Sequence, residues 1–138
     1  MHKSGYITII GNPNVGKSTL LNNVIGEKIS STSNKAQTTR HRLLGILNSD
    51  NYQMIFSDTP GVIESSYELH KTMMSNVKNS LSDSDLILYI VGNKKDDLFN
   101  KNIRESLIKS KIKMFILINK VDLMNQNDVE DLIKYWNE

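Results

Sequence analysis

The stretch Gly11-Asn-Pro-Asn-Val-Gly16-Lys17-Ser18 decides how this chain of 138 residues folds. An apolar run, Tyr6–Ile10, precedes it, and a helix-forming segment, 19–24, follows it. Two glycines and a Lys-Ser pair at this spacing, between a strand and a helix, are typical of a phosphate-binding loop. The glycines allow successive backbone N–H groups to point into one concavity, and the helix adds unpaired amides and the positive end of its dipole. We therefore predict that residues 11–18, the phosphate loop, bind a polyphosphate.

The lysine and the hydroxyl residue of this motif have separate predicted roles. Lys17 would reach between the outer phosphates, whereas Ser18 would place its hydroxyl on a Mg²⁺ ion that also holds a phosphate oxygen. The predicted phosphate-binding residues of this segment are Gly11, Asn12, Pro13, Asn14, Val15, Gly16, Lys17, Ser18 and Thr19.

Composition excludes several classes of protein. The net charge is +2, with acidic and basic residues interspersed, so no basic field argues for nucleic acid by itself. The chain has no cysteine, which excludes disulfides, thiolate metal sites and a cysteine nucleophile. No apolar run approaches the roughly 20 residues that a membrane-spanning helix needs, and no signal peptide precedes the first predicted strand. The protein is therefore expected to be cytoplasmic.

Apolar runs of strand length alternate with segments of helical period along the chain. The predicted strands are Tyr6–Ile10, Leu43–Leu47, Tyr52–Ser57, Leu86–Val91 and Met114–Ile118. A polar connection, residues 48–51, joins the second strand to the third and indicates a hairpin. Helical periods follow the first strand, recur over 69–81 and 103–108, and end the chain, where Asn127 and Glu130 have the spacing of a capping box. This pattern predicts an α/β fold of the P-loop NTPase type, with a mostly parallel sheet, one antiparallel edge strand and helices on both faces.

A second motif, Asp58-Thr-Pro-Gly61, ends the third predicted strand. After a phosphate loop, an Asp-x-x-Gly element allows the carboxylate to hold Mg²⁺ through water and the glycine amide to bond the terminal phosphate. Asp58 is therefore a predicted metal residue, and Gly61 a predicted phosphate-binding residue. The same four residues would also fit a simple turn, so this interpretation depends on the phosphate loop that precedes them.

A third motif, Asn119-Lys-Val-Asp122, follows the last predicted strand and would select the base. The Asp122 carboxylate can accept hydrogen bonds from N1–H and the exocyclic amine of guanine, groups that adenine lacks at those positions. We expect Asn119 to tie this base loop, residues 119–122, to the phosphate loop, and Lys120 to pack along the base. The alternative is a polar loop in which Asp122 caps a helix. The predicted ligand is GTP or GDP.

The polar, serine-rich segment 26–35 has neither a helical nor a strand period and is expected to form a mobile loop. We expect Thr39 to lend its hydroxyl to Mg²⁺ when GTP is bound, which would make residues 27–39 the first switch. The following Arg40-His41-Arg42 would either contact RNA or a protein partner, or form a solvated surface.

Four segments together resemble the GTPase domain of the Era family, which belongs to the bacterial translation-factor-related GTPases. They are Gly11–Ser18, Lys35-Ala-Gln-Thr-Thr-Arg-His-Arg42, Asp58–Gly61 and Asn119–Asp122. The second segment is close to diagnostic for this family. The resemblance implies a Mg²⁺-dependent GTPase that cycles between GTP and GDP states, binds the RNA of the small ribosomal subunit and assists the maturation of that subunit. It also implies a cytoplasmic protein that can associate peripherally with the inner membrane.

Two features of the family are missing from residues 1–138. The final guanine-contacting loop usually contains Ser-Ala, but the only alanine is Ala36, and the strand and helix around that loop are absent as well. The C-terminal KH domain, which binds RNA through a GxxG loop, is also absent. We therefore expect an incomplete GTPase domain with an exposed sheet flank beside Met114–Ile118, reduced stability and a weaker grip on guanine.

Intrinsic hydrolysis of GTP is expected to be slow. Val62 occupies the position where Ras-like GTPases have a glutamine that orients the attacking water. In similar GTPases an asparagine at the place of Asn14 helps to hold K⁺, which can replace an arginine finger. The alternative is that Asn14 only stabilises the loop.

Two other interpretations of the whole chain stay open. One is a nucleotide-binding module that no longer turns over, because part of the base pocket and the RNA-binding domain are missing. The other is a sister-family GTPase of tRNA modification or large-subunit assembly. Arg40-His41-Arg42 argues against the sister families, which usually have Thr-Arg-Asp there.

Overall fold

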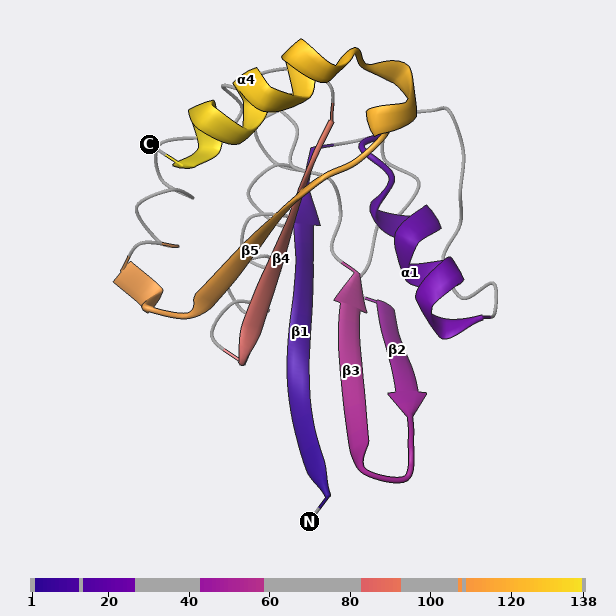
Figure 1. The fold of residues 1–138 in the computed structure, drawn as a ribbon. Coiled ribbons are helices and arrows are strands. Elements are labelled where there is room, and N and C mark those ends of the chain that lie inside the picture. The colour runs from indigo at the N-terminus through magenta and orange to yellow at the C-terminus, as the bar shows by residue number, and fades with distance from the viewer. Residues whose placement is uncertain are drawn as a thin grey trace, which may run out of the picture.

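A five-stranded sheet organises the protein (Figure 1). The structure, a computed structural model, describes residues 2–12, 14–26, 43–58, 83–92, 107 and 109–137. The strands are β1 (Lys3–Gly11), β2 (Leu43–Asn48), β3 (Tyr52–Asp58), β4 (Leu86–Val91) and β5 (Lys113–Ile118). Their order is β2-β3-β1-β4-β5, and all neighbours are parallel except β2 and β3. The predicted mostly parallel sheet with one antiparallel edge strand is confirmed.

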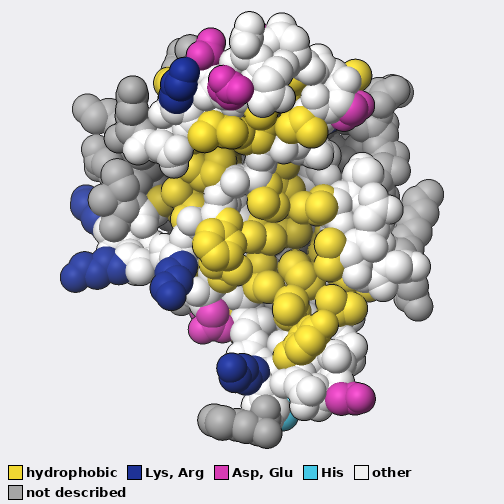
Figure 2. Space-filling view, in the orientation of Figure 1, with side chains coloured by type: hydrophobic (Ala, Val, Ile, Leu, Met, Phe, Trp, Pro, Cys, Tyr) yellow, Lys and Arg dark blue, Asp and Glu magenta, His cyan; other side chains and the backbone are white. Residues whose placement is uncertain are grey.

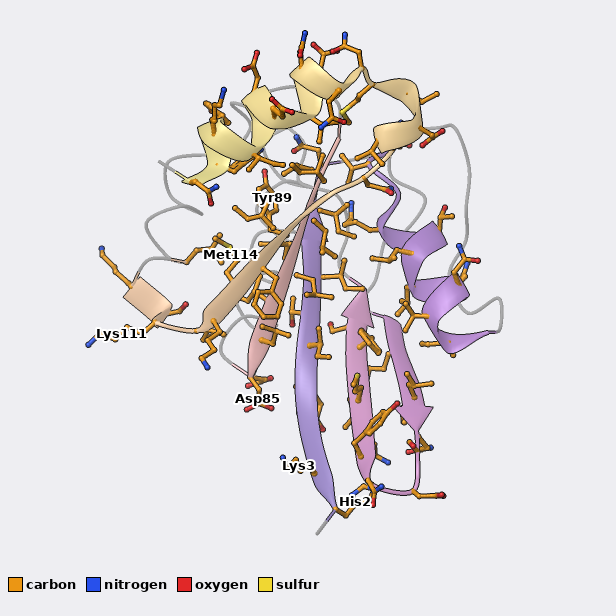
Figure 3. The ribbon with its side chains drawn as sticks, in the orientation of Figure 1. His2, Lys3, Asp85, Tyr89, Lys111 and Met114 are labelled. Carbon is orange, nitrogen blue, oxygen red and sulfur yellow. The ribbon has the colours of Figure 1, made fainter. Side chains whose placement is uncertain are left out.

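The two ends of the sheet differ in what they carry. Because β1, β3, β4 and β5 run parallel, their carboxyl ends meet at one end, which is where ligands bind in sheets of this kind. His2, Lys3 and Asp85 lie at the other end (Figure 3). There the Asp85 carboxylate accepts a hydrogen bond from the backbone N–H of Tyr6 at 2.8 Å. The polar motifs and this charged end are therefore separated by the length of the strands.

Helices lie on both faces of the sheet, as predicted. On one face α1 (Lys17–Ile25) buries Leu21 completely. On the other face lies α4 (Gln126–Asn137), which the short 3-10 helix η1 (Val121–Leu123) connects to β5 (Figure 1). Neither α1 nor α4, among the described segments, is long and apolar enough to cross a membrane.

The predicted capping box at the start of α4 is wrong. The helix begins at Gln126, and Asn125 caps it: the Asn125 side-chain oxygen accepts a hydrogen bond from the Asp128 N–H at 2.9 Å. The Glu130 carboxylate instead accepts one from the Gln126 side-chain amide at 3.0 Å. Asn125 and Asn127 are both followed three residues later by an acidic residue, so the spacing alone could not separate them.

Two apolar clusters fill the space between the sheet and its helices. The cluster on the α4 side contains Ile10, Ile87, Tyr89, Val91 and Leu107. There the ring of Trp136 meets Tyr89 edge to face, with 5.3 Å between the ring centroids. The cluster on the α1 side contains Ile9, Val15, Leu21, Phe56 and Ile90. Val15 belongs to the phosphate loop, so this loop is anchored directly in the core.

The α1 side of the sheet, the front face, keeps a broad apolar surface exposed (Figure 2). Phe115 of β5 is 57% exposed, and its register partner Leu88 is half-buried. Alternation along the strand places Leu117 on the same side and Met114, which is 40% exposed, on the opposite side. The expected exposed flank at β5 is therefore present.

Several predicted features lie outside the described residues. They are the helices over 69–81 and most of 103–108, the first switch, and the site residues Pro13, Thr39 and Gly61.

Candidate nucleotide-binding site

The two glycines of the phosphate loop are required by the backbone itself. Gly11 ends β1 with a φ of 152°, and a Cβ there would overlap the carbonyl oxygen of Ile90 in β4. Gly16 precedes α1 with a φ of 104°, and a Cβ there would overlap the side-chain nitrogen of Asn119. Residues with side chains rarely adopt these φ values. The loop therefore makes its tight path only with glycine at both positions.

Lys17 is held inside the phosphate loop. Its side chain is 7% exposed, and its ammonium donates hydrogen bonds to the carbonyl oxygens of Gly11 at 3.0 Å and of Asn12 at 2.7 Å. A buried positive charge is tolerated only when hydrogen bonds replace its water shell, and charge-assisted bonds of this kind are strong. The loop therefore keeps a fixed positive charge at the carboxyl end of β1, where a phosphate group would be attracted.

The base loop is joined to the phosphate loop through Asn119. The Asn119 backbone N–H donates to the Val91 carbonyl at the end of β4, at 2.9 Å. Its side-chain amide donates to the Val15 carbonyl at 2.7 Å, across 104 residues of sequence. The link predicted between the two loops is therefore present. It also explains the need for Gly16, since the amide occupies the space that a Cβ would take.

Lys120 makes a second link between the loops that the sequence does not predict. Its ammonium donates to the Asn14 carbonyl at 2.7 Å. Both residues have left-handed backbone conformations, with φ of 59° at Lys120 and 63° at Asn14. Such values are uncommon for residues other than glycine and are maintained only where the surroundings fix them. Lys120 thus contacts the phosphate loop, which is a contact beyond its predicted packing along the base.

Asp122 lies in η1, one turn beyond this link, and is exposed. Its neighbours Val121 and Leu123 are 49% and 67% exposed. An exposed carboxylate can accept hydrogen bonds from the N–H groups of a ligand without a rearrangement of the chain. The geometry is therefore compatible with the predicted contact to the edge of guanine.

The described residues fit a Mg²⁺ site built partly by the ligand. Ser18 lies in the first turn of α1, and the backbone of Asp58 ends β3, in register with Ile9 near the end of β1. Two of the three predicted metal residues, Ser18 and Asp58, thus lie at the same end of the sheet, and the third, Thr39, lies outside the described residues. Mg²⁺ usually takes one or two protein oxygens and completes its shell with water and substrate phosphate. Within the described ranges there is no cluster of three or more His, Cys, Asp or Glu that would hold a metal without a ligand.

No sequence pattern predicts the environment of the Asn12 side chain. This residue is 6% exposed, and within the described ranges its side-chain nitrogen, Nδ2, is buried without a hydrogen-bond partner. Burial of a loop residue depends on tertiary packing, which no local pattern reports.

A phosphate loop at the end of the central strand, hydrogen-bonded to an Asn-Lys-x-Asp loop two strands away, defines a P-loop nucleotide-binding domain. Comparison with known protein families is more specific. The chain belongs to the family described as 50S ribosome-binding GTPase, which matches residues 6–120.

Individual relatives are similar over almost the whole chain. GTPase Era of Clostridium beijerinckii is 44% identical over 140 aligned positions, which cover 100% of this chain and 47% of that protein. A crystal structure of Era with MgGDPNP and nucleotides 1506–1542 of 16S ribosomal RNA has a TM-score of 0.88 and 38% identity, over 98% of this chain and 47% of the other. An Era variant from Aquifex aeolicus bound to GDP and AlF4⁻ has a TM-score of 0.87 and 37% identity, over 96% and 46%. The chain thus spans about half the length of these relatives.

Proposed function

We propose that this chain binds GTP and GDP through the described loops and hydrolyses GTP as a molecular switch. The observation that carries the proposal is the hydrogen bond from the Asn119 amide to the Val15 carbonyl, at 2.7 Å. It joins a loop suited to phosphate with a loop suited to guanine before any ligand is bound. A nucleotide that fits both loops therefore meets a site whose two halves already stand at a fixed spacing.

Different residues of the site would bind different parts of the nucleotide. The phosphate loop and Gly61 would surround the phosphates, and Lys17 would contact the outer ones. Mg²⁺ would be held by Ser18, by Asp58 through water, and by Thr39 in the GTP state. Once bound, the ion would neutralise phosphate charge. Asn119, Lys120 and Asp122 would hold the base.

The proposed cellular role is assistance to assembly of the small ribosomal subunit and to maturation of its RNA. Support comes from the sequence similarity to GTPase Era and from the Era crystal structure that contains a 16S ribosomal RNA fragment. RNA binding is proposed only for a longer protein that joins this GTPase domain to a KH domain, as members of the family do. A cytoplasmic location with peripheral association at the inner membrane is proposed on the same resemblance.

K⁺ is proposed as a second cofactor, held with the help of Asn14. This residue is exposed at the outer side of the phosphate loop, and the bond from Lys120 fixes its backbone. A cation there would supply positive charge to the phosphates, which Val62 cannot. We expect faster GTP hydrolysis in K⁺ than in Na⁺, and we expect Asn14→Ala to abolish the difference. Equal rates of the unaltered chain in the two salts would contradict this part of the proposal.

Displacement of fluorescent GDP tests nucleotide binding directly. The purified chain is titrated with fluorescent GDP in Mg²⁺ and K⁺, and unlabelled GTP and ATP are then added as competitors. We expect GTP to displace the probe and ATP to fail. Adenine has no N–H donor at N1 and no amine at C2, so Asp122 would have no hydrogen bond to accept from it. Displacement by both nucleotides, or by neither, would reject guanine selectivity.

Phosphate release under saturating GTP then separates a switch from a binding module. We expect slow but measurable release that disappears in Lys17→Met. Tight binding without release above the rate in buffer would favour the module without turnover.

A further inference from the structure

One edge of the described sheet is open. Among the described strands, β5 is last in the order β2-β3-β1-β4-β5 and pairs only with β4. Its Phe115 is 57% exposed on the front face, and its Met114 is 40% exposed on the opposite face. The remaining residues of β5 are apolar apart from Lys113, which begins the strand. An exposed apolar edge strand of this kind is a template for pairing with a further strand.

The backbone of β5 defines which residues are available for that pairing. The Asn119 N–H points toward β4, where it donates to the Val91 carbonyl at 2.9 Å. Because backbone groups alternate in direction along a strand, the N–H and C=O groups of Met114, Ile116 and Ile118 point away from β4. These three residues therefore supply the hydrogen-bonding groups of the open edge.

The two ends of β5 differ in charge. Residues 109–113, which lead into the strand, include three lysines and no carboxylate, whereas residues 119–137 after it carry four carboxylates and two lysines. Lys111, beside the start of β5, and Lys113 are exposed (Figure 3). Asp122, just after the end of the strand, is exposed as well. The edge is therefore basic at its amino end and acidic at its carboxyl end.

This division of charge favours one orientation of a partner strand. Two β5 strands side by side in the antiparallel sense bring the basic end of each beside the acidic end of the other, whereas a parallel arrangement brings like charges together. Asp85 also lies at the amino end of the sheet, but its carboxylate accepts the Tyr6 N–H of β1, on the far side of β4 from this edge. Complementary charges help to select a partner and to fix its register.

We propose that two copies of this chain associate through antiparallel pairing of their β5 strands, about a twofold axis at Ile116. In this register Ile116 faces its own counterpart, and Met114 faces Ile118 of the second copy, so the outward-facing groups exchange hydrogen bonds. Phe115 lies opposite Leu117 of the second copy on the front face, where an aromatic and an aliphatic side chain stabilise the pair. The association is a property of the sheet edge and does not depend on the proposed nucleotide binding.

Sedimentation equilibrium of the chain tests the association. An interface made mainly of one strand pair is small, so we expect a monomer–dimer equilibrium with a dissociation constant on the order of 10 µM. Met114→Pro removes an outward-facing N–H and leaves the bonds to β4 in place, so it should weaken the dimer at least about tenfold. Far-ultraviolet circular dichroism checks that this variant is folded.

Charge reversal supplies a second variant that does not alter the backbone. Lys111→Glu combined with Lys113→Glu should weaken the dimer about fivefold or more at low ionic strength, since like charges would then meet at both ends of the interface. Lys3→Glu is the matched control, because Lys3 is exposed at the same end of the sheet but belongs to β1. It should leave the dissociation constant unchanged.

The register can be tested by crosslinking, because the chain has no cysteine of its own. Phe115→Cys and Leu117→Cys chains are prepared separately, mixed and oxidised. Opposed residues of a non-hydrogen-bonded pair have Cα atoms about 4.5 Å apart, which a disulfide can bridge. We expect the mixture to form several times more crosslinked dimer than either chain alone. Leu44→Cys, 54% exposed on the other edge strand, β2, should crosslink with neither.

Four results would overturn the proposal. A chain that is monomeric at every concentration would mean that another partner takes the edge. A dimer that both the proline variant and the charge-reversal variant leave unchanged would place the interface elsewhere, as would equal crosslinking through Leu44→Cys. Oligomers that keep growing with concentration would exclude twofold pairing, which closes on itself. If Met114→Pro is unfolded, the charge-reversal variant and the crosslinking decide.

Discussion

The phosphate loop and the base loop are built to different degrees before a ligand arrives. In the phosphate loop Asn12, Val15 and Lys17 are buried, and the lysine charge already has two carbonyl partners. In the base loop Lys120 and Asp122 are exposed. A site that is organised in advance loses less entropy on binding, so it gains affinity from the same contacts. We infer that the phosphate loop supplies most of the affinity, and that the base loop supplies the choice of ligand.

Two hydrogen bonds join the base loop to the phosphate loop, so the two loops do not act independently. Asn119 and Lys120 both belong to the base loop and both donate to carbonyl oxygens of the phosphate loop, each at 2.7 Å. Inosine diphosphate lacks the exocyclic amine of guanine but has the same phosphates. The ratio of its dissociation constant to that of GDP therefore reports on the base loop alone, while parallel changes in both constants report on the phosphate loop.

The largest effect is expected for Lys17→Met. The variant keeps the aliphatic stem but removes the charge that would contact the β-phosphate of either diphosphate, so GDP and inosine diphosphate should both weaken by at least about a hundredfold. Their ratio should stay constant. Calorimetric titration measures both constants, with Lys134→Met on the exposed side of α4 as the control. A change in the ratio would show that the two loops do not divide affinity and choice as inferred.

Asp122→Asn should have the next largest effect, and it should change the ratio. Asparagine keeps one acceptor oxygen for N1–H but is neutral, and it opposes the exocyclic amine of guanine with a second donor. GDP should therefore weaken roughly a hundredfold, whereas inosine diphosphate, which lacks that amine, should weaken roughly tenfold through the lost charge. Asp131→Asn, on exposed α4, provides a matched control. If both nucleotides weakened equally, Asp122 would be supporting the loop rather than reading the base.

Asn119→Ala should lower both affinities together, about tenfold, because it removes the bond that sets the spacing of the loops. The free energy of unfolding of the nucleotide-free chain should fall by about 1 kcal/mol, since the Val15 carbonyl loses its partner. Urea titration followed by circular dichroism measures this change. An unaltered unfolding free energy together with full affinity would mean that the link is dispensable.

Lys120→Met should have the smallest effect of the four. The bond from its ammonium to the Asn14 carbonyl is exposed, so water replaces much of what is lost, and both affinities should fall only about two- to fivefold. The comparison of interest is with Asn119→Ala under the same conditions. A larger loss for Lys120→Met would reverse the ranking of the two links.

Much of this architecture could be predicted because its causes are local. The apolar runs that became β1, β4 and β5 are read from periodicity, and the Gly-x4-Gly-Lys-Ser pattern fixes the turn from strand to helix. The hydrogen bond from Asn119 to the phosphate loop was predictable, because the Asn-Lys-x-Asp motif implies this link. The bond of Lys120, the buried amide of Asn12 and the start of α4 were not predictable, since each depends on which of several similar polar groups the tertiary fold brings within reach.

The exposed front face will also govern how the chain behaves during purification. Phe115 is exposed on this face, with the half-buried Leu88 and Leu117 on the same side of the sheet, and Figure 2 shows a broad apolar surface there. Sulfate and similar salts are excluded from protein surfaces and strengthen apolar contacts, whereas cooling weakens them. The folded chain should therefore be retained on a phenyl resin at moderate sulfate concentration and elute early when the column is chilled.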